Sequence, residues 1–187
     1  MRIISGNLKG KSIAFVKSST TRPLKDSVKE SIFNVLIHSN LFNINIKDSN
    51  VLDLYSGIGS FGLECISRGS EKVTFVEKDK IAIKILKENL LNLLVQEKGI
   101  VMNDEIINYL KIETIKNFNI IFIDPPFAEN NFLNELKLIK EKKIFKKNHI
   151  IIIHREKNSN DVYEEGFNPI IIKKYGRSKI IFGKFLT

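Results

Sequence analysis

The segment Ile120-Ile121-Phe122-Ile123-Asp124-Pro125-Pro126-Phe127 determines how the rest of this sequence is interpreted. Its first four residues are β-branched or aromatic, which predicts a short buried strand. Asp124 ends that strand, because the two prolines that follow cannot continue a hydrogen-bonded ladder. Pro125 and Pro126 also restrict the preceding backbone to extended conformations, so the Asp124 carboxylate and the loop carbonyls are expected to be held rigidly. These oxygens suit the exocyclic amine of a planar group, and Phe127 could stack on its ring.

The composition of the chain favours one domain in a reducing compartment. A length of 187 residues suits one domain, with or without a small extension. The single cysteine, Cys65, excludes an internal disulfide and is expected to be a small core residue. No apolar run is long enough for a membrane-spanning helix, and residues 1–6 lack the apolar stretch of a signal peptide, so we expect a cytoplasmic protein. The formal net charge of +9 favours a polyanionic partner such as nucleic acid, although a chain rich in Lys, Asn and Ile is also what AT-rich coding produces.

The hydrophobic pattern alternates between strands and helices along most of the chain. Strands are expected at residues 51–54, 73–76, 100–102, 120–123 and 149–153, and helices at residues 26–37, 61–68, from Lys80 onward and 132–139. The tail around residues 170–172 and 179–182 is expected to form an antiparallel hairpin. This order predicts an α/β fold with a doubly wound, mostly parallel sheet. Residues 1–25 are interpreted as a basic N-terminal arm or hairpin, and residues 26–187 as the main domain.

Carboxylates occur at or just after the ends of four expected strands. In open α/β sheets, ligands bind beyond the carboxyl ends of the strands. One acidic residue at such a position is ordinary, but four along the same edge indicate a site. The four residues are Asp53, Glu77, Asp104 and Asp124.

The segment Tyr55-Ser56-Gly57-Ile58-Gly59-Ser60-Phe61-Gly62 has the GxGxxG spacing of nucleotide-binding loops. A pyrophosphate would be repelled by Asp53, which directly precedes the loop, whereas a carboxylate suits the positively charged methionine end of S-adenosylmethionine. Glu77 could hold the ribose hydroxyls of either a dinucleotide or S-adenosylmethionine, and Asp104 would accept a hydrogen bond from the adenine amine. The pattern therefore favours methyl transfer over hydride transfer.

These motifs resemble those of the class I methyltransferases. They are the segment from Asp53 to Gly62, Glu77-Lys78-Asp79, Asn103-Asp104 and Asp124-Pro125-Pro126-Phe127. Further motifs are similar to those of the RsmD family, bacterial enzymes that methylate N2 of guanine in 16S ribosomal RNA. These are Met1-Arg2-Ile3-Ile4-Ser5-Gly6, Lys9-Gly10, Thr21-Arg22-Pro23 and Val28-Lys29-Glu30. The resemblance extends through Tyr175-Gly176 and implies a Rossmann-like fold that uses S-adenosylmethionine.

The residue pattern and the resemblance together assign a role to each part of the site. Methyl transfer to a base that has left its stack is expected at Asp124, Pro125, Pro126 and Phe127. S-adenosylmethionine is expected to be held by Asp53, Tyr55, Ser56, Gly57, Gly59, Glu77, Lys78, Asp104 and Asp124. RNA phosphates are expected to contact Arg2, Lys9, Lys11 and Arg22. No metal is expected, and the partner is expected to be ribosomal RNA, within the small subunit or an assembly intermediate, bound by a monomer.

Two positions depart from the family pattern. Tyr55-Ser56 stands where such enzymes more often have Phe-Ala, and His154 ends the fifth strand where many relatives carry an acidic residue. His38, His149 and His154 are interpreted as structural, because they form no recognisable triad or metal-ligand pattern with the acidic residues. Two other functions stay open: a non-catalytic RNA-binding or ribosome-assembly factor on the same fold, and an amino methyltransferase acting on DNA adenine.

Overall fold

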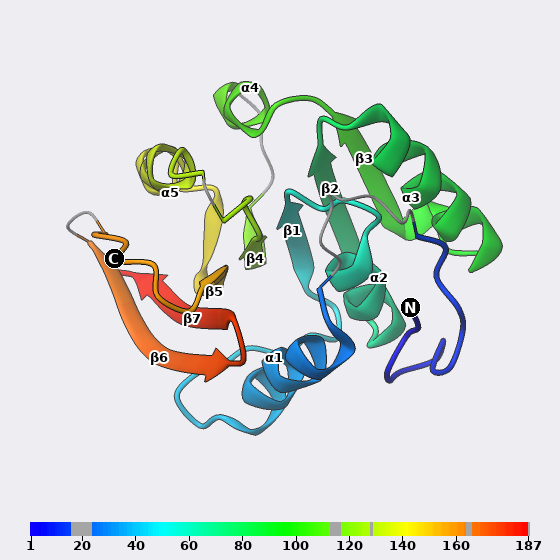
Figure 1. Cartoon of the computed structure of the whole chain (residues 1–187), viewed down its shortest axis with the longest axis horizontal. Coiled ribbons are helices and arrows are strands. Elements are labelled where there is room, and N and C mark those ends of the chain that lie inside the picture. The colour runs from blue at the N-terminus through cyan, green and yellow to red at the C-terminus, as the bar shows by residue number, and fades with distance from the viewer. Residues whose placement is uncertain (16–23, 113–116, 128, 164–165, 187) are drawn as a thin grey trace.

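The protein is built on one seven-stranded sheet (Figure 1). The computed structural model describes residues 1–15, 24–112, 117–127, 129–163 and 166–186. The strands lie in the order β3-β2-β1-β4-β5-β7-β6. Their bounds are β1 (Asn50–Leu54), β2 (Lys72–Glu77), β3 (Gly99–Asn103), β4 (Phe118–Ile123), β5 (Phe145–Glu156), β6 (Phe167–Tyr175) and β7 (Ser178–Phe185).

Strands β1 to β5 are mutually parallel, whereas β7 runs antiparallel to both β5 and β6. The central strands are buried on both faces, as expected of a parallel sheet covered by helices: Ile120, Ile121 and Ile123 of β4 are fully buried. This arrangement confirms the predicted α/β fold, including the antiparallel C-terminal hairpin. Strand β5 is longer than predicted at both ends, because the polar residues on either side of Ile150–Ile153 interrupt the apolar pattern.

Helices cover both faces of the sheet. Successive residues of β4 point to opposite sides: Ile120 and Phe122 belong to the buried cluster that includes residues of α1, α2 and α3, whereas Ile121 and Ile123 belong to the cluster that includes residues of α4 and α5. The bounds of the helices are α1 (Asp26–His38), α2 (Ser60–Ser67), α3 (Lys80–Asn92), α4 (Ile106–Lys111) and α5 (Phe132–Glu141), with a 3₁₀ turn at Gln96–Lys98. Helix α4 was not predicted. Cys65 of α2 is a buried core residue, as expected. Within the described ranges, no helix is long and apolar enough to cross a membrane.

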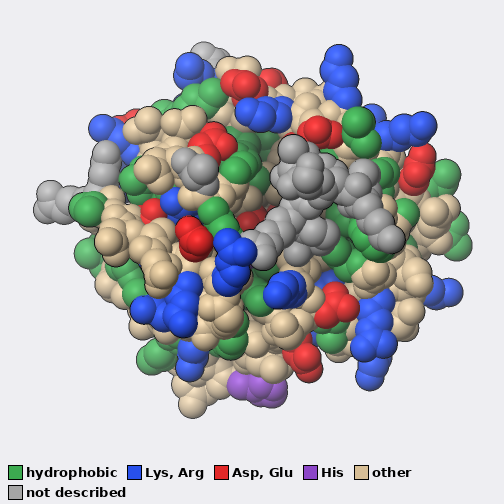
Figure 2. All heavy atoms as spheres, in the orientation of Figure 1, with side chains coloured by type: hydrophobic (Ala, Val, Ile, Leu, Met, Phe, Trp, Pro, Cys, Tyr) green, Lys and Arg blue, Asp and Glu red, His purple; other side chains and the backbone are tan. Residues whose placement is uncertain are grey.

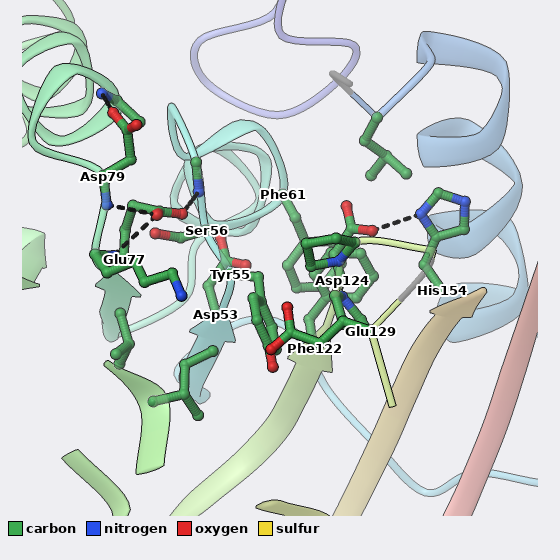
Figure 3. A pocket seen from close by; sticks show the side chains of 18 of the residues that line it. Asp53, Tyr55, Ser56, Phe61, Glu77, Asp79, Phe122, Asp124, Glu129 and His154 are labelled. Carbon is green, nitrogen blue, oxygen red and sulfur yellow. Dashed lines mark hydrogen bonds and ion pairs between the residues drawn. The ribbon is translucent and has the colours of Figure 1, made fainter. Parts of the chain in front are cut away.

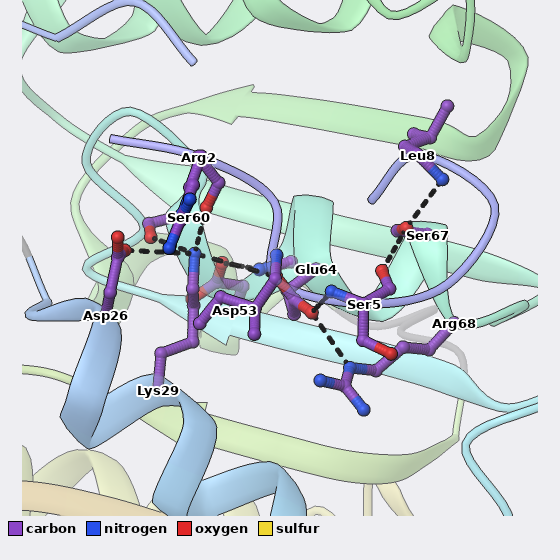
Figure 4. A network of polar contacts seen from close by, with 12 residues as sticks. Arg2, Ser5, Leu8, Asp26, Lys29, Asp53, Ser60, Glu64, Ser67 and Arg68 are labelled. Carbon is purple, nitrogen blue, oxygen red and sulfur yellow. Dashed lines mark hydrogen bonds and ion pairs between the residues drawn. The ribbon is translucent and has the colours of Figure 1, made fainter. Parts of the chain in front are cut away.

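The first residues of the chain are docked onto α2 (Figure 4). An antiparallel bridge joins Arg2 to Ser12, and the carboxylate of Glu64 accepts hydrogen bonds from the backbone N–H groups of Ile4 (2.8 Å) and Ser5 (2.9 Å). Ser67 also contacts this segment, since its Oγ accepts from the N–H of Leu8 at 3.0 Å. The described start of the chain is therefore fixed to the domain by hydrogen bonds to buried side chains of α2.

A buried ionic cluster lies beneath this docked segment. The Nζ of Lys29 donates to the carbonyl of Arg2 at 2.9 Å and lies 3.6 Å from Glu64 Oε2. Glu64 also accepts from Arg68 Nε at 2.9 Å. Burial lowers the pKa of Lys29, against the opposing attraction of Glu64 and Asp26. The Glu64 carboxylate thus neutralises two cations, Lys29 and Arg68, and accepts from two backbone N–H groups. Its removal would leave buried polar groups without a partner.

We expect Glu64→Ala to lower the free energy of unfolding by about 3 kcal/mol or more, because it removes the buried carboxylate partner of Lys29 and the acceptor of the Ile4 and Ser5 N–H groups, and leaves Lys29 with the half-exposed Asp26 at 3.8 Å. Urea denaturation followed by circular dichroism measures this. The matched control is Glu88→Ala on the exposed face of α3, which should change stability by less than about 0.5 kcal/mol. Equal losses in the two variants would show that the cluster is not a determinant of stability.

Candidate active site

The carboxyl ends of β1, β2, β3 and β4 open into one cavity of about 780 Å³ (Figure 3). This volume lies within the range of small-molecule sites. Most of the residues predicted for methyl transfer or cofactor binding line it. They are Asp53, Tyr55, Ser56, Gly57, Glu77, Lys78, Asp104, Asp124, Pro125, Pro126 and Phe127.

The other predicted residues lie elsewhere. Gly59 does not line the cavity. Its φ is +85°, and a Cβ added to it would lie 2.4 Å from Leu86 Cδ1, so a glycine is needed here for the close packing against α3. Arg2, Lys9 and Lys11 are exposed residues of the docked N-terminal segment and do not line the cavity. Arg22 lies outside the described residues.

Asp53 is buried at the end of β1. Its side chain is 1% exposed, and its Oδ2 accepts a hydrogen bond from the N–H of Gly62 in the first turn of α2 at 2.9 Å. Burial raises the pKa of Asp53 well above its ordinary value; the hydrogen bond from Gly62 opposes this, and the negative charges of Asp124 and Glu77 add to it. A cationic ligand in the cavity would offset that cost by stabilising the ionised carboxylate.

The loop after β1 turns sharply around Gly57. Tyr55 has a φ of +58° and Gly57 a φ of +53°, both in the left-handed region. A Cβ added at Gly57 would meet no atom within 4 Å, so the backbone borders open space there. The Oγ of Ser56 is buried and finds no hydrogen-bond partner among the described residues. An unsatisfied hydroxyl beside open backbone is what a polar ligand would complete.

Glu77 joins the glycine loop to the end of β2. Its Oε2 accepts from the N–H of Gly57 at 2.8 Å, and its Oε1 accepts from the N–H groups of Lys78 and Asp79 at 2.9 Å each. Asp79 in turn caps α3 through hydrogen bonds from Ile81 and Ala82. The side chain of Lys78 is exposed, with its Nζ 3.8 Å from Glu105 Oε1. The Glu77 carboxylate is thereby oriented at the edge of the cavity.

Asp104 lies just beyond the end of β3. Its Oδ1 accepts hydrogen bonds from the N–H of Glu105 at 2.7 Å and from Asn108 Nδ2 at 2.9 Å. The apolar side chains of Ile106 and Ile107, from the first turn of α4, line the cavity beside it. A carboxylate next to apolar side chains suits a planar ring that carries an amine.

The loop after β4 is held in place from β5. The N–H of Asp124 donates to the carbonyl of Leu54 at 3.3 Å. The guanidinium of Arg155, only 2% exposed, donates to the carbonyl of Glu129 at 3.0 Å and more weakly to that of Pro126 at 3.4 Å. It also donates to Asn130 Oδ1 at 3.0 Å. The rigidity inferred from the two prolines is thus reinforced by a buried arginine, which the sequence did not reveal.

The interpretation of His154 as a residue apart from the acidic cluster is wrong. His154 Nδ1 lies 2.8 Å from Asp124 Oδ1, and His154 Nε2 lies 2.8 Å from Ser178 Oγ (Figure 3). The imidazole also meets the ring of Phe127 edge-on, with 5.4 Å between centroids. The residue was missed because the contact depends on β4 pairing with β5 and on β5 pairing with β7, neither of which a local pattern reports.

Sequence reasoning also missed Glu135 of α5. Its side chain is 5% exposed, and both carboxylate oxygens lie within hydrogen-bond distance of the Tyr55 hydroxyl, at 2.9 and 3.0 Å. Burial raises the pKa of Glu135 to about 7, with the hydrogen bond from Tyr55 acting in the opposite direction and Glu129 adding to the rise. Burial likewise raises the pKa of Tyr55. The sequence did carry one signal for this role: Glu135 is a charged residue beside Leu136 on the apolar face of the predicted helix.

The remaining wall of the cavity comes from the two ends of the chain, which sequence reasoning did not assign to the site. Phe15, Leu24 and Lys25 line it from the N-terminal side, and Tyr175 and Arg177 line it from the turn between β6 and β7. The cavity therefore has an acidic floor along the strand ends and a mixed aromatic and basic rim.

The donor set fits S-adenosylmethionine. Carboxylates suit its ammonium and sulfonium groups and its ribose and adenine donors. The Ser56 hydroxyl, which has no partner in the part of the chain that the structure describes, and the open backbone at Gly57 leave room for a polar ligand. The sheet order, the reversed strand β7 and this acidic edge define the chain as a class I methyltransferase in fold and site.

Comparison with known proteins agrees with this class. The family model described as "Conserved hypothetical protein 95" matches residues 1–184, and the chain belongs to this family. "Ribosomal RNA small subunit methyltransferase D" of Haemophilus influenzae is 34% identical over 178 residues, covering 94% of this chain and 89% of that protein. The protein of the same name from Buchnera aphidicola subsp. Acyrthosiphon pisum is 35% identical, covering 84% and 79%. The resemblance to the RsmD family is confirmed.

Solved structures show the same fold. The structure of HI0767 from Haemophilus influenzae is 31% identical, with a TM-score of 0.78, and the match covers 100% of this chain and 98% of that chain. The structure of yhhF from Escherichia coli is 24% identical, with a TM-score of 0.85 and the same coverage. The architecture is thus shared over the full length of the chain.

The pKa of Glu135 makes the stability of the protein depend on pH. Because its pKa is raised from 4.5 to about 7 in the folded state, Glu135 contributes stability that is fully present below pH 4.5 and is lost as the pH rises through 7. The loss corresponds to about 3 kcal/mol. We expect the free energy of unfolding of wild type, relative to that of Glu135→Gln, to fall between pH 5 and pH 8 in urea denaturation. Parallel pH profiles of the two proteins would contradict the assignment.

Proposed function

We propose that this protein transfers the methyl group of S-adenosylmethionine to the exocyclic N2 of a guanine in small-subunit ribosomal RNA. The observation that carries the proposal is the single cavity into which both the acidic strand ends and the loop from Asp124 to Phe127 open. The names of the curated relatives support ribosomal RNA of the small subunit as the substrate. The choice of guanine N2 rests on the amine-binding character of the Asp124 loop and on the resemblance to the RsmD family.

One half of the cavity suits the cofactor, which supplies the methyl group. Asp53 would attract its cationic methionine end, Glu77 would accept from the ribose hydroxyls, and Asp104 would accept from the adenine amine. Ser56, Gly57 and Lys78 would complete this half, with Gly59 behind them in contact with α3. Because Asp53 is buried and near other carboxylates, a positive charge is the ligand property that this half selects most strongly.

The other half of the cavity suits a base that has left its stack. Asp124 and the Pro125 carbonyl would accept from the amine and turn its lone pair toward the methyl group, and Phe127 would stack on the ring. Pro126 fixes the direction of the loop. As the new N–C bond forms and the S–C bond breaks, one N2 proton would pass to Asp124 and then to water. Positioning supplies most of the rate, since transfer from a sulfonium needs little acid catalysis.

The charges at the rim of the cavity fit a polyanionic partner. Lys25, Lys78 and Arg177 line the cavity, and Figure 2 shows Lys and Arg side chains, interspersed with Asp and Glu side chains, around the hollow on this face. We propose that residues 1–25 form an RNA-contacting arm on the methyltransferase domain of residues 26–187, with Arg22 among its contacts. The proposal includes a monomer that acts in the cytoplasm, where ribosomal subunits assemble.

The proposed reaction is tested by transfer of labelled methyl from S-adenosylmethionine to unmodified small ribosomal subunits, their stripped RNA and duplex DNA, followed by nucleoside analysis. We expect N2-methylguanosine, and we expect Asp124→Ala to lower kcat by about 100-fold or more, because the amine loses its acceptor. Glu141→Ala, at the exposed end of α5, is the matched control and should retain full activity.

Each other outcome of this assay supports a different function. Near-normal turnover by a folded Asp124→Ala variant would remove Asp124 from the mechanism. Labelled adenine in DNA would favour a DNA amino methyltransferase. Cofactor binding without transfer to any substrate would favour a ribosome-assembly factor.

The N-terminal segment is tested separately through the salt dependence of RNA binding. We expect replacement of Lys9 and Lys11 by Glu to reduce the slope of log affinity against log salt by about one unit for each phosphate that the variant no longer neutralises. Both side chains are exposed. The control replaces the exposed Lys111 and Lys147, which do not line the cavity, and should leave the slope closer to that of wild type. Equal slopes in all three proteins would argue against the arm.

A further inference from the structure

We propose that His154 and Ser178 are positioning residues for Asp124, an inference that rests on the proposed methyl transfer. The observation is a continuous chain of hydrogen bonds: Asp124 Oδ1 to His154 Nδ1 at 2.8 Å, and His154 Nε2 to Ser178 Oγ at 2.8 Å (Figure 3). All three residues line the cavity. They come from three neighbouring strands or strand ends, since Asp124 follows β4, His154 lies in β5, and Ser178 begins β7.

The chemistry of the partners fixes the direction of the first hydrogen bond. A carboxylate accepts hydrogen bonds and cannot donate them, so His154 Nδ1 carries a proton in either charge state of the ring. In the neutral ring this leaves Nε2 as the acceptor, and the Ser178 hydroxyl, which can donate or accept, donates to it. Asp124 therefore sets the tautomer of His154, and the hydrogen bond of Ser178 to Nε2 holds the ring so that Nδ1 stays directed at Asp124.

The surroundings of His154 make this bond rigid. His154 is 8% exposed, and it is paired with Ile180 across the β5–β7 ladder. The edge contact with Phe127 holds the imidazole on its other side, at 5.4 Å between centroids. Arg155, next in the chain, anchors the backbone of the loop that carries Phe127 through the Pro126 and Glu129 carbonyls.

The consequence is a division of labour between the two oxygens of Asp124. Oδ1 is held by His154, and among the described residues none hydrogen-bonds to Oδ2. Oδ2 is then the oxygen that accepts from the N2 amine and takes its proton as the N–C bond forms. His154 keeps its own proton throughout, so it acts by fixing the direction of Oδ2 and the position of Phe127, two of the contacts to the base.

The test uses variants of His154 and Ser178 that separate the loss of the hydrogen-bond donor to Asp124 from the loss of the imidazole ring itself. Asparagine places its Nδ2 where histidine has Nδ1, the same number of bonds from the backbone, so His154→Asn keeps the donor to Asp124. His154→Ala removes it, and Ser178→Ala removes the hydrogen bond that holds the ring at Nε2. The matched control is His149→Asn, because His149 is a histidine of β5, more deeply buried than His154, that bonds to the backbone of Lys146 and Phe185 and does not line the cavity.

Steady-state kinetics on ribosomal RNA should rank the variants by kcat. We expect kcat to fall about 10- to 100-fold in His154→Ala and about three- to tenfold in Ser178→Ala, because a misdirected acceptor lowers the fraction of reactive complexes. His154→Asn should lie within about threefold of wild type, and KM for RNA and the affinity for S-adenosylmethionine should change less than about twofold in all three. His149→Asn should lower the melting temperature and leave kcat unchanged.

The outcomes separate this inference from the proposed function. If wild type forms N2-methylguanosine and His154→Ala is as fast as wild type, positioning by His154 is overturned while the proposed function holds. A loss in His154→Asn as large as that in His154→Ala overturns it as well. If wild type methylates another amine, the proposed substrate is wrong and the same ranking on that amine decides the inference. Absence of any transfer by wild type overturns both.

Discussion

The buried guanidinium of Arg155 is the interaction on which the site geometry depends. It is paired with Asp161 at 3.0 Å, lies over the ring of Phe132 at 4.4 Å, and donates to the loop that follows Asp124. Burial alone would raise the pKa of Asp161, but hydrogen bonds from Arg155 and Ser159 outweigh it and hold that pKa below its ordinary value. A buried pair of this kind costs several kcal/mol to break, so Arg155 ties β5 firmly to the loop after Asp124 and to the start of α5.

That rigidity matters because the parallel sheet concentrates negative charge at one edge. Asp53, Glu77 and Asp124 end neighbouring strands, and the resulting repulsion contributes to the raised pKa of Asp53. The chain satisfies these groups locally: Gly62 donates to Asp53, Gly57 donates to Glu77, and His154 donates to Asp124. The acidic edge is therefore stable without a ligand and still favours a cation, which is the electrostatic requirement for a sulfonium cofactor.

The parts of this arrangement that follow from local pattern could be predicted from the sequence. Apolar β-branched runs such as Ile120–Ile123 mark buried strands, and parallel topology brings residues at their ends, such as Asp53 and Asp124, to one edge. Helix α4 was missed because six residues hold too few turns to show a period. His154, Ser178 and Arg155 were missed for a different reason: their roles depend on which strands pair and in what register, and this information is spread over distant parts of the chain.

The two departures from the family pattern show how buried polar groups are accommodated in this site. A hydroxyl at Tyr55 inside the cavity wall requires a partner, and Glu135 provides it at 2.9 Å. The Glu135 carboxylate would add a negative charge to an already acidic edge, but burial raises its pKa to about 7, so much of the charge is absent at neutral pH. At His154, a donor stands beside Asp124 where an acidic residue would add to the repulsion. Both positions leave the edge acidic enough to bind a cation, and both limit the electrostatic cost of burying its carboxylates. A rigid, partly desolvated methyl-transfer site requires this balance.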